Sequence, residues 1–162
     1  MVVRNRNGDP VVIENAPFMD DGRPMPTTFW LVDPGIREAV ARIESNGGVR
    51  KAEAEIAAAD IEMAHRLYRS LRDKRVGPRT NGPVPSGGVG GTRRGVKCLH
   101  AHVAWTLAGG DDPVGRWTLQ RILIEEQGPA LIEGLEAGVV DNLRLLLHQG
   151  TDSLVPMERS NV

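Results

Sequence analysis

One cysteine and two histidines lie close together near the middle of the chain. Cys98, His100 and His102 occupy alternate positions. In a strand all three side chains would lie on one face, as a tetrahedral zinc site requires, whereas in a helix only Cys98 and His102 would lie together, one turn apart. A neighbouring thiol and imidazole could also act as a nucleophile and its base. We therefore take Cys98, His102 and His100 as candidate catalytic residues.

The residues around this group favour the helix. Apolar side chains recur at helical spacing, and Gly109 and Gly110 supply a stop, so we predict a helix over 96–108. A helical Cys98–His102 pair needs a third ligand from another element, and the candidates are Asp33, His65, Asp111 and Asp112. We predict Cys98, His102 and Asp33 as the metal ligands, with zinc or another divalent metal as the cofactor. The alternative is a buried thiol beside two hydrogen-bonded core histidines.

A glycine-rich, basic loop comes just before these residues. Residues 86–94 read SGGVGGTRR. Glycines expose backbone N–H groups, and a following helix adds the positive end of its dipole, so the loop could cradle a phosphate or carboxylate. The predicted anion-binding residues are Gly88, Gly90, Gly91, Arg93, Arg94 and Lys97. The loop lacks the Walker A ending and the dinucleotide fingerprint, and the alternative is a flexible linker.

The formal net charge of -1 hides an uneven distribution. Residues 66–97 carry nine basic side chains and one acidic side chain, which creates a local positive potential. This block either pairs with the acidic ends of the chain or binds an anionic ligand or an acidic protein partner. Aromatic residues make up 4% of the chain and no nucleic-acid motif is present, which argues against nucleic acid as the partner.

The length and composition predict one globular domain. The chain has 162 residues, which fits a single domain over 1–150 and a flexible tail over 150–162. One cysteine excludes an internal disulfide. No apolar run approaches the roughly 18 residues of a membrane span, and the first residues lack a signal-peptide core. We therefore expect a cytoplasmic protein without membrane insertion.

The pattern of elements predicts a mainly α (α+β) fold, a compact helical domain with a short N-terminal β-ribbon. β-branched and aromatic runs over 11–13 and 27–32 predict the ribbon within 1–32. Two helices follow within 33–75, at 34–45 and 49–75, the first opened by Asp33 and Pro34. A Gly/Pro-rich basic loop over 76–95 leads to the helices of 96–149. We place Trp105 and Trp117 in the core and interpret Asp112 as the cap of a helix beginning at Pro113.

Several segments together resemble a known group of sequences. Taken in order, they are similar to the mainly actinobacterial domain of unknown function family 501, over roughly 5–117; the segments are 8–13, 26–31, 88–91, 95–102 and 107–115. The stretch GVKCLHAH is the most specific of them. The resemblance brings no established activity. It implies that genes of the family often lie beside those of a septum-formation protein and an exopolyphosphatase. This neighbourhood is a hint towards the cell envelope or phosphate metabolism.

This chain departs from the family pattern at two positions. Where the relatives have cysteines, it has Asn5 and Asp33. If those cysteines and the GVKCLHAH stretch form a metal site in the relatives, this chain has lost two soft ligands. Asp33 could still bind a metal through its carboxylate, whereas Asn5 is a poor zinc ligand.

These observations support two hypotheses about function. The first is a cytoplasmic anion-binding protein, a hydrolase or transferase on a phosphorylated or carboxylated small molecule, with the Cys/His site beside the glycine loop. The alternative is a non-catalytic adaptor that binds an acidic protein partner in cell division or envelope assembly. The adaptor would use the basic end of the 49–75 helix and leave the cysteine and histidines as packing.

Overall fold

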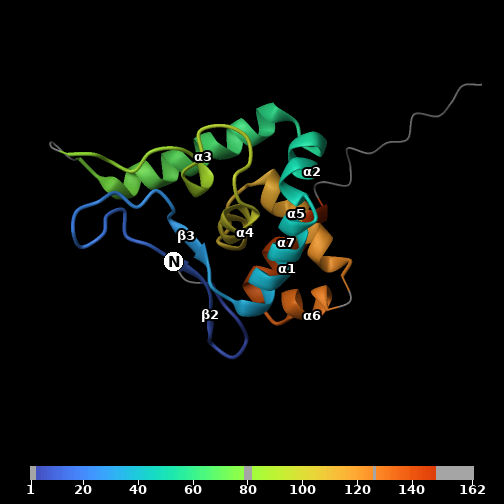
Figure 1. Cartoon of the computed structure of the whole chain (residues 1–162). Helices are drawn as coiled ribbons and strands as arrows, with labels where there is room; N and C mark the ends of the chain where they lie inside the picture. The colour runs from blue at the N-terminus through green and yellow to red at the C-terminus, as the bar shows by residue number, and fades with distance from the viewer. Residues whose placement is uncertain (1–2, 79–81, 126, 149–162) are drawn as a thin grey trace, which may run out of the picture.

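The N-terminal part of the chain forms a small antiparallel sheet. The computed structural model describes residues 3–78, 82–125 and 127–148. Strands β1 (Val3–Arg4), β2 (Pro10–Glu14) and β3 (Phe29–Leu31) pair in the order β1-β2-β3 (Figure 1). Val12 pairs with Val3 on one side and with Leu31 on the other, and it is fully buried. The predicted ribbon is confirmed, and β1 is an addition to it.

Helices make up most of the described chain, which confirms the mainly α (α+β) fold. They are α1 (Pro34–Ser45), α2 (Gly48–Glu55), α3 (Ala58–Val76), α4 (Leu99–Leu107), α5 (Pro113–Leu123), α6 (Gly128–Glu133) and α7 (Ala137–His148), with a 3-10 turn η1 (Val89–Gly91) before α4. As predicted, Asp33 caps α1 and Asp112 caps α5. No helix within the described ranges combines the length and apolarity needed to cross a bilayer.

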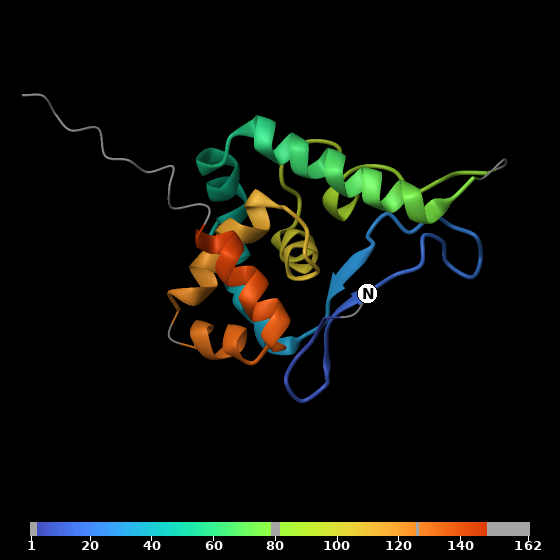
Figure 2. The ribbon, with the colours of Figure 1, turned by 180° about the vertical axis from the view of Figure 1, so that it is seen from behind.

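The single helix predicted over 49–75 is wrong, because the chain bends between α2 and α3. Ile56 has extended backbone angles, φ -104° and ψ 132°, and interrupts the helical hydrogen bonds. The side chain of Glu55 accepts hydrogen bonds from Trp117 Nε1 at 2.8 Å and from Arg121 at 2.6 Å. These bonds tie the end of α2 to α5, while α3 leaves in another direction across the molecule (Figures 1 and 2).

Helix α4 is the centre of the core. It packs against α5, β3 and α1, and both views show it in the middle of the molecule (Figures 1 and 2). Trp105 and Trp117 are buried, as predicted. The ring of Trp105 meets Tyr68 of α3 edge-on, with 5.2 Å between the ring centroids. The predicted helix over 96–108 is confirmed, but it begins at Leu99, so Cys98 is its N-cap residue.

The glycine segment, which we define as residues 82–98, runs back along α3 and leads into α4 (Figure 1). Arg72 of α3 donates to the carbonyl of Gly87 at 2.6 Å, and His65 of α3 accepts from the N–H of Val89 at 3.1 Å. A Cβ at Gly88 would collide with the His65 ring, so only glycine fits there. The segment is therefore packed against α3 at several points rather than joined only at its ends.

Candidate functional site

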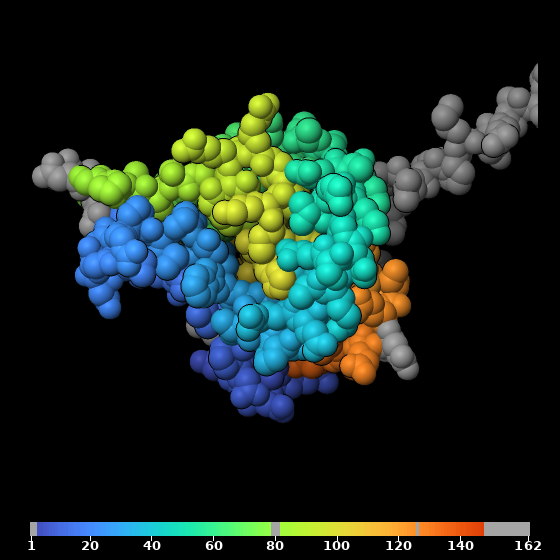
Figure 3. All heavy atoms as spheres, in the orientation of Figure 1, coloured from blue at the N-terminus to red at the C-terminus, as the bar shows by residue number. Residues whose placement is uncertain are grey.

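A hollow of about 460 Å³ lies between β3 and the start of α4. Its lining combines aromatic, cationic and reactive side chains, among them Phe29, Trp30, Arg37, Lys97, Cys98 and His100. In the space-filling view, the N-terminal segment, α1 and the residues leading into α4 meet on one face (Figure 3). A hollow of this size suits a small molecule.

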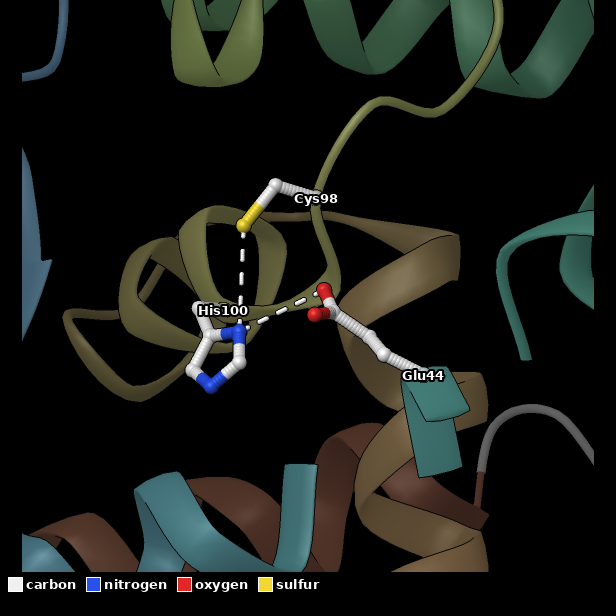
Figure 4. Close-up of side chains that lie close together, drawn as sticks. All are labelled: Glu44, Cys98 and His100. Carbon is white, nitrogen blue, oxygen red and sulfur yellow. Dashed lines mark hydrogen bonds and ion pairs between the residues drawn. The ribbon is translucent and has the colours of Figure 1, made fainter. Parts of the chain in front are cut away.

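At the edge of the hollow, Cys98 and His100 form a cluster with Glu44 (Figure 4). The Cys98 sulfur lies 3.8 Å from His100 Nδ1, and Glu44 Oε1 lies 3.3 Å from the same nitrogen. All three side chains are half-buried. Two elements supply them, since Glu44 belongs to the last turn of α1 and the other two belong to the start of α4. The cluster therefore depends on the packing of α1 against α4.

The environment of His100 favours its protonated form. Its pKa is raised to about 8, first by the hydrogen bond with Cys98 and then by the charges of Glu44 and Cys98, against the opposing effect of burial. The other ring nitrogen, Nε2, donates to the backbone carbonyl of Arg37 at 3.1 Å. The ring is thereby fixed in orientation, with Nδ1 towards the sulfur and the carboxylate.

Glu44 is a member of the candidate site that the sequence analysis missed. Its Oε1 accepts the N–H of Leu99 at 2.6 Å, so it caps the first turn of α4 from 55 positions earlier in the chain. One signal was available in the sequence. A carboxylate in the last turn of a helix opposes the helix dipole, and such a residue calls for a partner outside its own helix.

His102 does not join Cys98. Because α4 begins after Cys98, the one-turn spacing does not bring the two side chains together, and His102 points into the core, where it is 1% exposed. Its Nδ1 donates to Asp112 Oδ2 at 2.6 Å, while Asp112 Oδ1 caps α5 by accepting the N–H groups of Val114 and Gly115. Among the described residues, His102 Nε2 has no hydrogen-bond partner.

Asp33, the third predicted metal ligand, also lies elsewhere. It accepts the N–H of Ile36 at 2.8 Å as the cap of α1, and together with Asn5 it lines another hollow, between β1 and α6. Asn5 and Asp33, the two positions at which the family resemblance implies cysteines, thus share a surface, and Cys98 is not part of its lining. The predicted set of Cys98, His102 and Asp33 is therefore not brought together, whereas Cys98 and His100 are.

Comparison with known proteins places the chain in a family. The sequence model described as "Protein of unknown function (DUF501)" matches residues 1–120. The chain belongs to the DUF501 family. Neither the curated proteins nor the solved structures contain a match. The DUF501 match covers the sheet, the glycine segment, α4 and all three residues of the Glu44–Cys98–His100 cluster.

In this DUF501 chain, two backbone N–H groups of the glycine segment already form hydrogen bonds within the segment. The N–H of Gly88 donates to Thr92 O at 2.6 Å, and the N–H of Gly91 donates to Gly88 O at 3.0 Å. Arg93 and Arg94 are exposed and do not line the hollow. Two of the predicted anion-binding residues do line it, and these are Gly90 and Lys97.

The basic block of the DUF501 chain is partly bound by the chain itself. Arg72 is 2% exposed and contacts Asp73 as well as the glycine segment. Arg75 pairs with Glu14 of β2 at 2.5 Å and lies over the ring of Phe29. These two arginines stabilise the contact between α3 and its neighbours, which reduces the charge left for a partner.

Proposed function

We propose that the hollow between β3 and α4 binds a small anionic molecule and presents it to Cys98. The observation that supports this proposal is that Arg37, Lys97, Cys98 and His100 line the same hollow. Two cationic side chains supply charge and hydrogen-bond donors for a phosphate or a carboxylate. Phe29 and Trp30 add an apolar wall for the rest of the molecule.

The proposed ligand class is a phosphorylated or carboxylated small molecule, and the proposed chemistry is hydrolysis or group transfer. The neutral form of His100 could accept the proton of the Cys98 thiol while the sulfur displaces the leaving group of the bound molecule, and the ring could then return that proton to the leaving group. The raised pKa of His100, about 8, means that this neutral form grows as the pH rises, and the Arg37 carbonyl and Glu44 hold the ring in place. We also propose a cytoplasmic location, since a reducing compartment keeps a single thiol free.

The adaptor alternative rests on the basic end of α3. Because Arg72 and Arg75 contact groups of the chain itself, we argue for the small-molecule site in preference to a protein partner.

A thermal-shift and calorimetric titration tests the proposal. The probes are inorganic phosphate, pyrophosphate and citrate, added to chelator-treated protein. We expect at least one of them to raise the melting temperature, because a ligand that binds only the native state stabilises it. Arg37→Gln and Lys97→Gln should each weaken binding roughly tenfold, as expected for the loss of one charged hydrogen bond.

Arg93→Gln and Arg94→Gln are the matched controls, because these arginines are exposed and lie outside the lining of the hollow. They should leave the binding constant unchanged. A loss of binding in these variants, with wild-type binding in Arg37→Gln, would move the anion site to the glycine segment. No response to any probe would reject the anion-binding proposal.

A further inference from the structure

We propose that Glu44, Cys98 and His100 bind a zinc ion at the edge of the hollow. The cluster offers a thiolate, an imidazole nitrogen and a carboxylate oxygen, which are the three ligand types that zinc takes from proteins. This site differs from the set predicted from the sequence, since only Cys98 is common to both. It also goes beyond the anion site, because metal binding here does not depend on any other ligand.

The distances between the donor atoms fit a shared metal ion. In a tetrahedral zinc site, bond lengths of about 2.3 Å to sulfur and about 2.0 Å to nitrogen or oxygen place sulfur and nitrogen about 3.5 Å apart and nitrogen and oxygen about 3.3 Å apart. The observed separations are 3.8 Å for Cys98 Sγ to His100 Nδ1 and 3.3 Å for His100 Nδ1 to Glu44 Oε1. All three ligand atoms lie within 4.8 Å of one another.

The hydrogen bonds around the cluster orient the donors towards one point. A carbonyl oxygen can only accept, so His100 Nε2 must carry the proton that it donates to Arg37, and Nδ1 is left as the coordinating atom. A histidine that binds a metal usually makes this kind of bond through its second nitrogen. Glu44 is held in turn by the N–H of Leu99.

The electrostatics of the cluster favour a positive charge among the three atoms. Sulfur, ring nitrogen and carboxylate oxygen are all electron-rich, and the three atoms lie within 4.8 Å of one another (Figure 4). Either a proton on the ring or a metal ion can supply that charge. The soft sulfur ligand and the matching distances favour zinc over a hard cation such as magnesium.

Three protein ligands leave one tetrahedral position for another molecule. Structural zinc sites are closed by four protein ligands, whereas catalytic ones keep an open position. Cys98 and His100 both line the hollow, so a metal held by them would border it. A zinc ion there would polarise an oxygen atom of a bound molecule or lower the pKa of a bound water.

The test measures metal binding alone, in buffer without phosphate or carboxylate. Full-length protein purified without an affinity tag is stripped with a chelator and titrated with zinc by calorimetry, and with cobalt(II) by absorption spectroscopy. We expect one equivalent to bind, with a thiolate-to-cobalt charge-transfer band and the visible spectrum of a tetrahedral cobalt centre. Binding of less than one equivalent, or a cobalt spectrum without the thiolate band, would overturn the proposal.

Three substitutions identify the ligands. Cys98→Ser should abolish the thiolate band, and Cys98→Ser, His100→Asn and Glu44→Gln should each weaken zinc binding by about 100-fold or more. Glu44→Gln keeps an acceptor for the Leu99 N–H, so its effect reports the lost carboxylate and not a lost helix cap. Asp33→Asn and Glu38→Gln are the controls and should bind like wild type.

Two outcomes would contradict this assignment. Binding that survives both Cys98→Ser and His100→Asn would place the metal elsewhere, and binding that is lost in Asp33→Asn would return it to the sequence-predicted set. Because the anion titration uses chelator-treated protein and the metal titration contains no anionic probe, each proposal can fail without the other.

Discussion

His100 and the core pair of His65 and His102 show how the same side chain serves different purposes in two regions. His100 lies at the edge of a hollow, half-buried, with a thiol and a carboxylate facing one ring nitrogen. The core rings lie 5.7 Å apart between α3 and α4, each at most 2% exposed. His65 bridges two backbone groups of the glycine segment, and His102 binds the cap of α5.

The two regions differ in the hydrogen-bond partners that the fold provides for the histidine ring nitrogens. The core histidines hold parts of the fold together, because His65 has a partner at each nitrogen and His102 has a buried carboxylate at one of them. At the edge, one nitrogen of His100 donates to the Arg37 carbonyl, while the other faces the Cys98 sulfur and the Glu44 carboxylate. Chemistry is therefore expected at the edge and stability in the core.

The largest effect on stability should come from Asp112→Ala. Asp112 is fully buried, and its loss removes two hydrogen bonds at the start of α5 and leaves the His102 N–H without an acceptor. Removal of one partner of such a buried pair should lower the free energy of unfolding by about 3–5 kcal/mol, measured by urea denaturation. Asp112→Asn keeps a capping oxygen and should recover about 1 kcal/mol. If Asp112→Ala left the free energy of unfolding unchanged, the contrast between the two regions would not hold.

The next largest effect on stability should come from zinc that binds at the Glu44–Cys98–His100 cluster. At a free concentration about 100 times its dissociation constant, zinc should raise the free energy of unfolding by about 2.7 kcal/mol. Differential scanning calorimetry with and without chelator measures this as a shift of the melting temperature. Cys98→Ser should remove the shift, whereas His65→Gln should retain it. An equal shift in Cys98→Ser would contradict the zinc site.

A smaller effect should appear as a pH dependence that arises from His65. Burial lowers the pKa of His65, so in acid the unfolded chain takes up a proton near the ordinary value of about 6.5 before the folded protein does. Stability should therefore be retained above that pH and fall on acidification, by at most about 1.4 kcal/mol per pH unit. In His65→Gln, the amide side chain can accept from the N–H of Val89 and donate to the carbonyl of Gly95, and it does not titrate. It should flatten this slope in denaturation curves between pH 5 and 7, and an unchanged slope would count against the assignment.

The smallest effect should come from His100→Asn in chelator-treated protein. Because the pKa of His100 is raised, its pairing stabilises the fold below the ordinary pKa of about 6.5, and this contribution is lost as the pH rises through about 8. The site is half-exposed and screened by solvent, so we expect a loss of about 1 kcal/mol or less near pH 6 and none near pH 9. Urea denaturation at the two pH values measures it. A loss comparable with that of Asp112→Ala would mean that His100 is a core residue.

Local signals in the sequence predicted the elements well. Asp33 and Asp112, each followed by proline, predicted two helix starts, and both cap their helices through side-chain oxygens. The break between α2 and α3 escaped prediction because Ile56 and the alanines around it favour an uninterrupted helix. The bonds of Glu55 to Trp117 and Arg121, 62 and 66 positions away, hold α2 on α5 instead.

The candidate site was predicted only in part. Cys98 and His100 were identified by residue type, but their pairing depends on Cys98 being the N-cap residue and not the first residue of a helical turn. That boundary is set by Glu44, which accepts the N–H of Leu99 from a distant helix. The predicted helix begins at residue 96 and the observed one at Leu99, and such a shift changes which side chains face each other. No local pattern reports the long-range contact that accompanies it.

Contacts of residues 5–6, just after β1, with residues 134–135, between α6 and α7, bear on where a shortened protein can end. The N–H of Arg6 donates to Gly134 O, and Asn5 forms a bridge with Leu135, which is 1% exposed. These partners lie past residue 120, where the family match stops. A fragment trimmed to the matched region would lose the buried side chains of Ile132, Leu135, Val140 and Leu143, and we expect it to aggregate on expression. The region that the family model matches is therefore shorter than the region whose residues pack together in this structure.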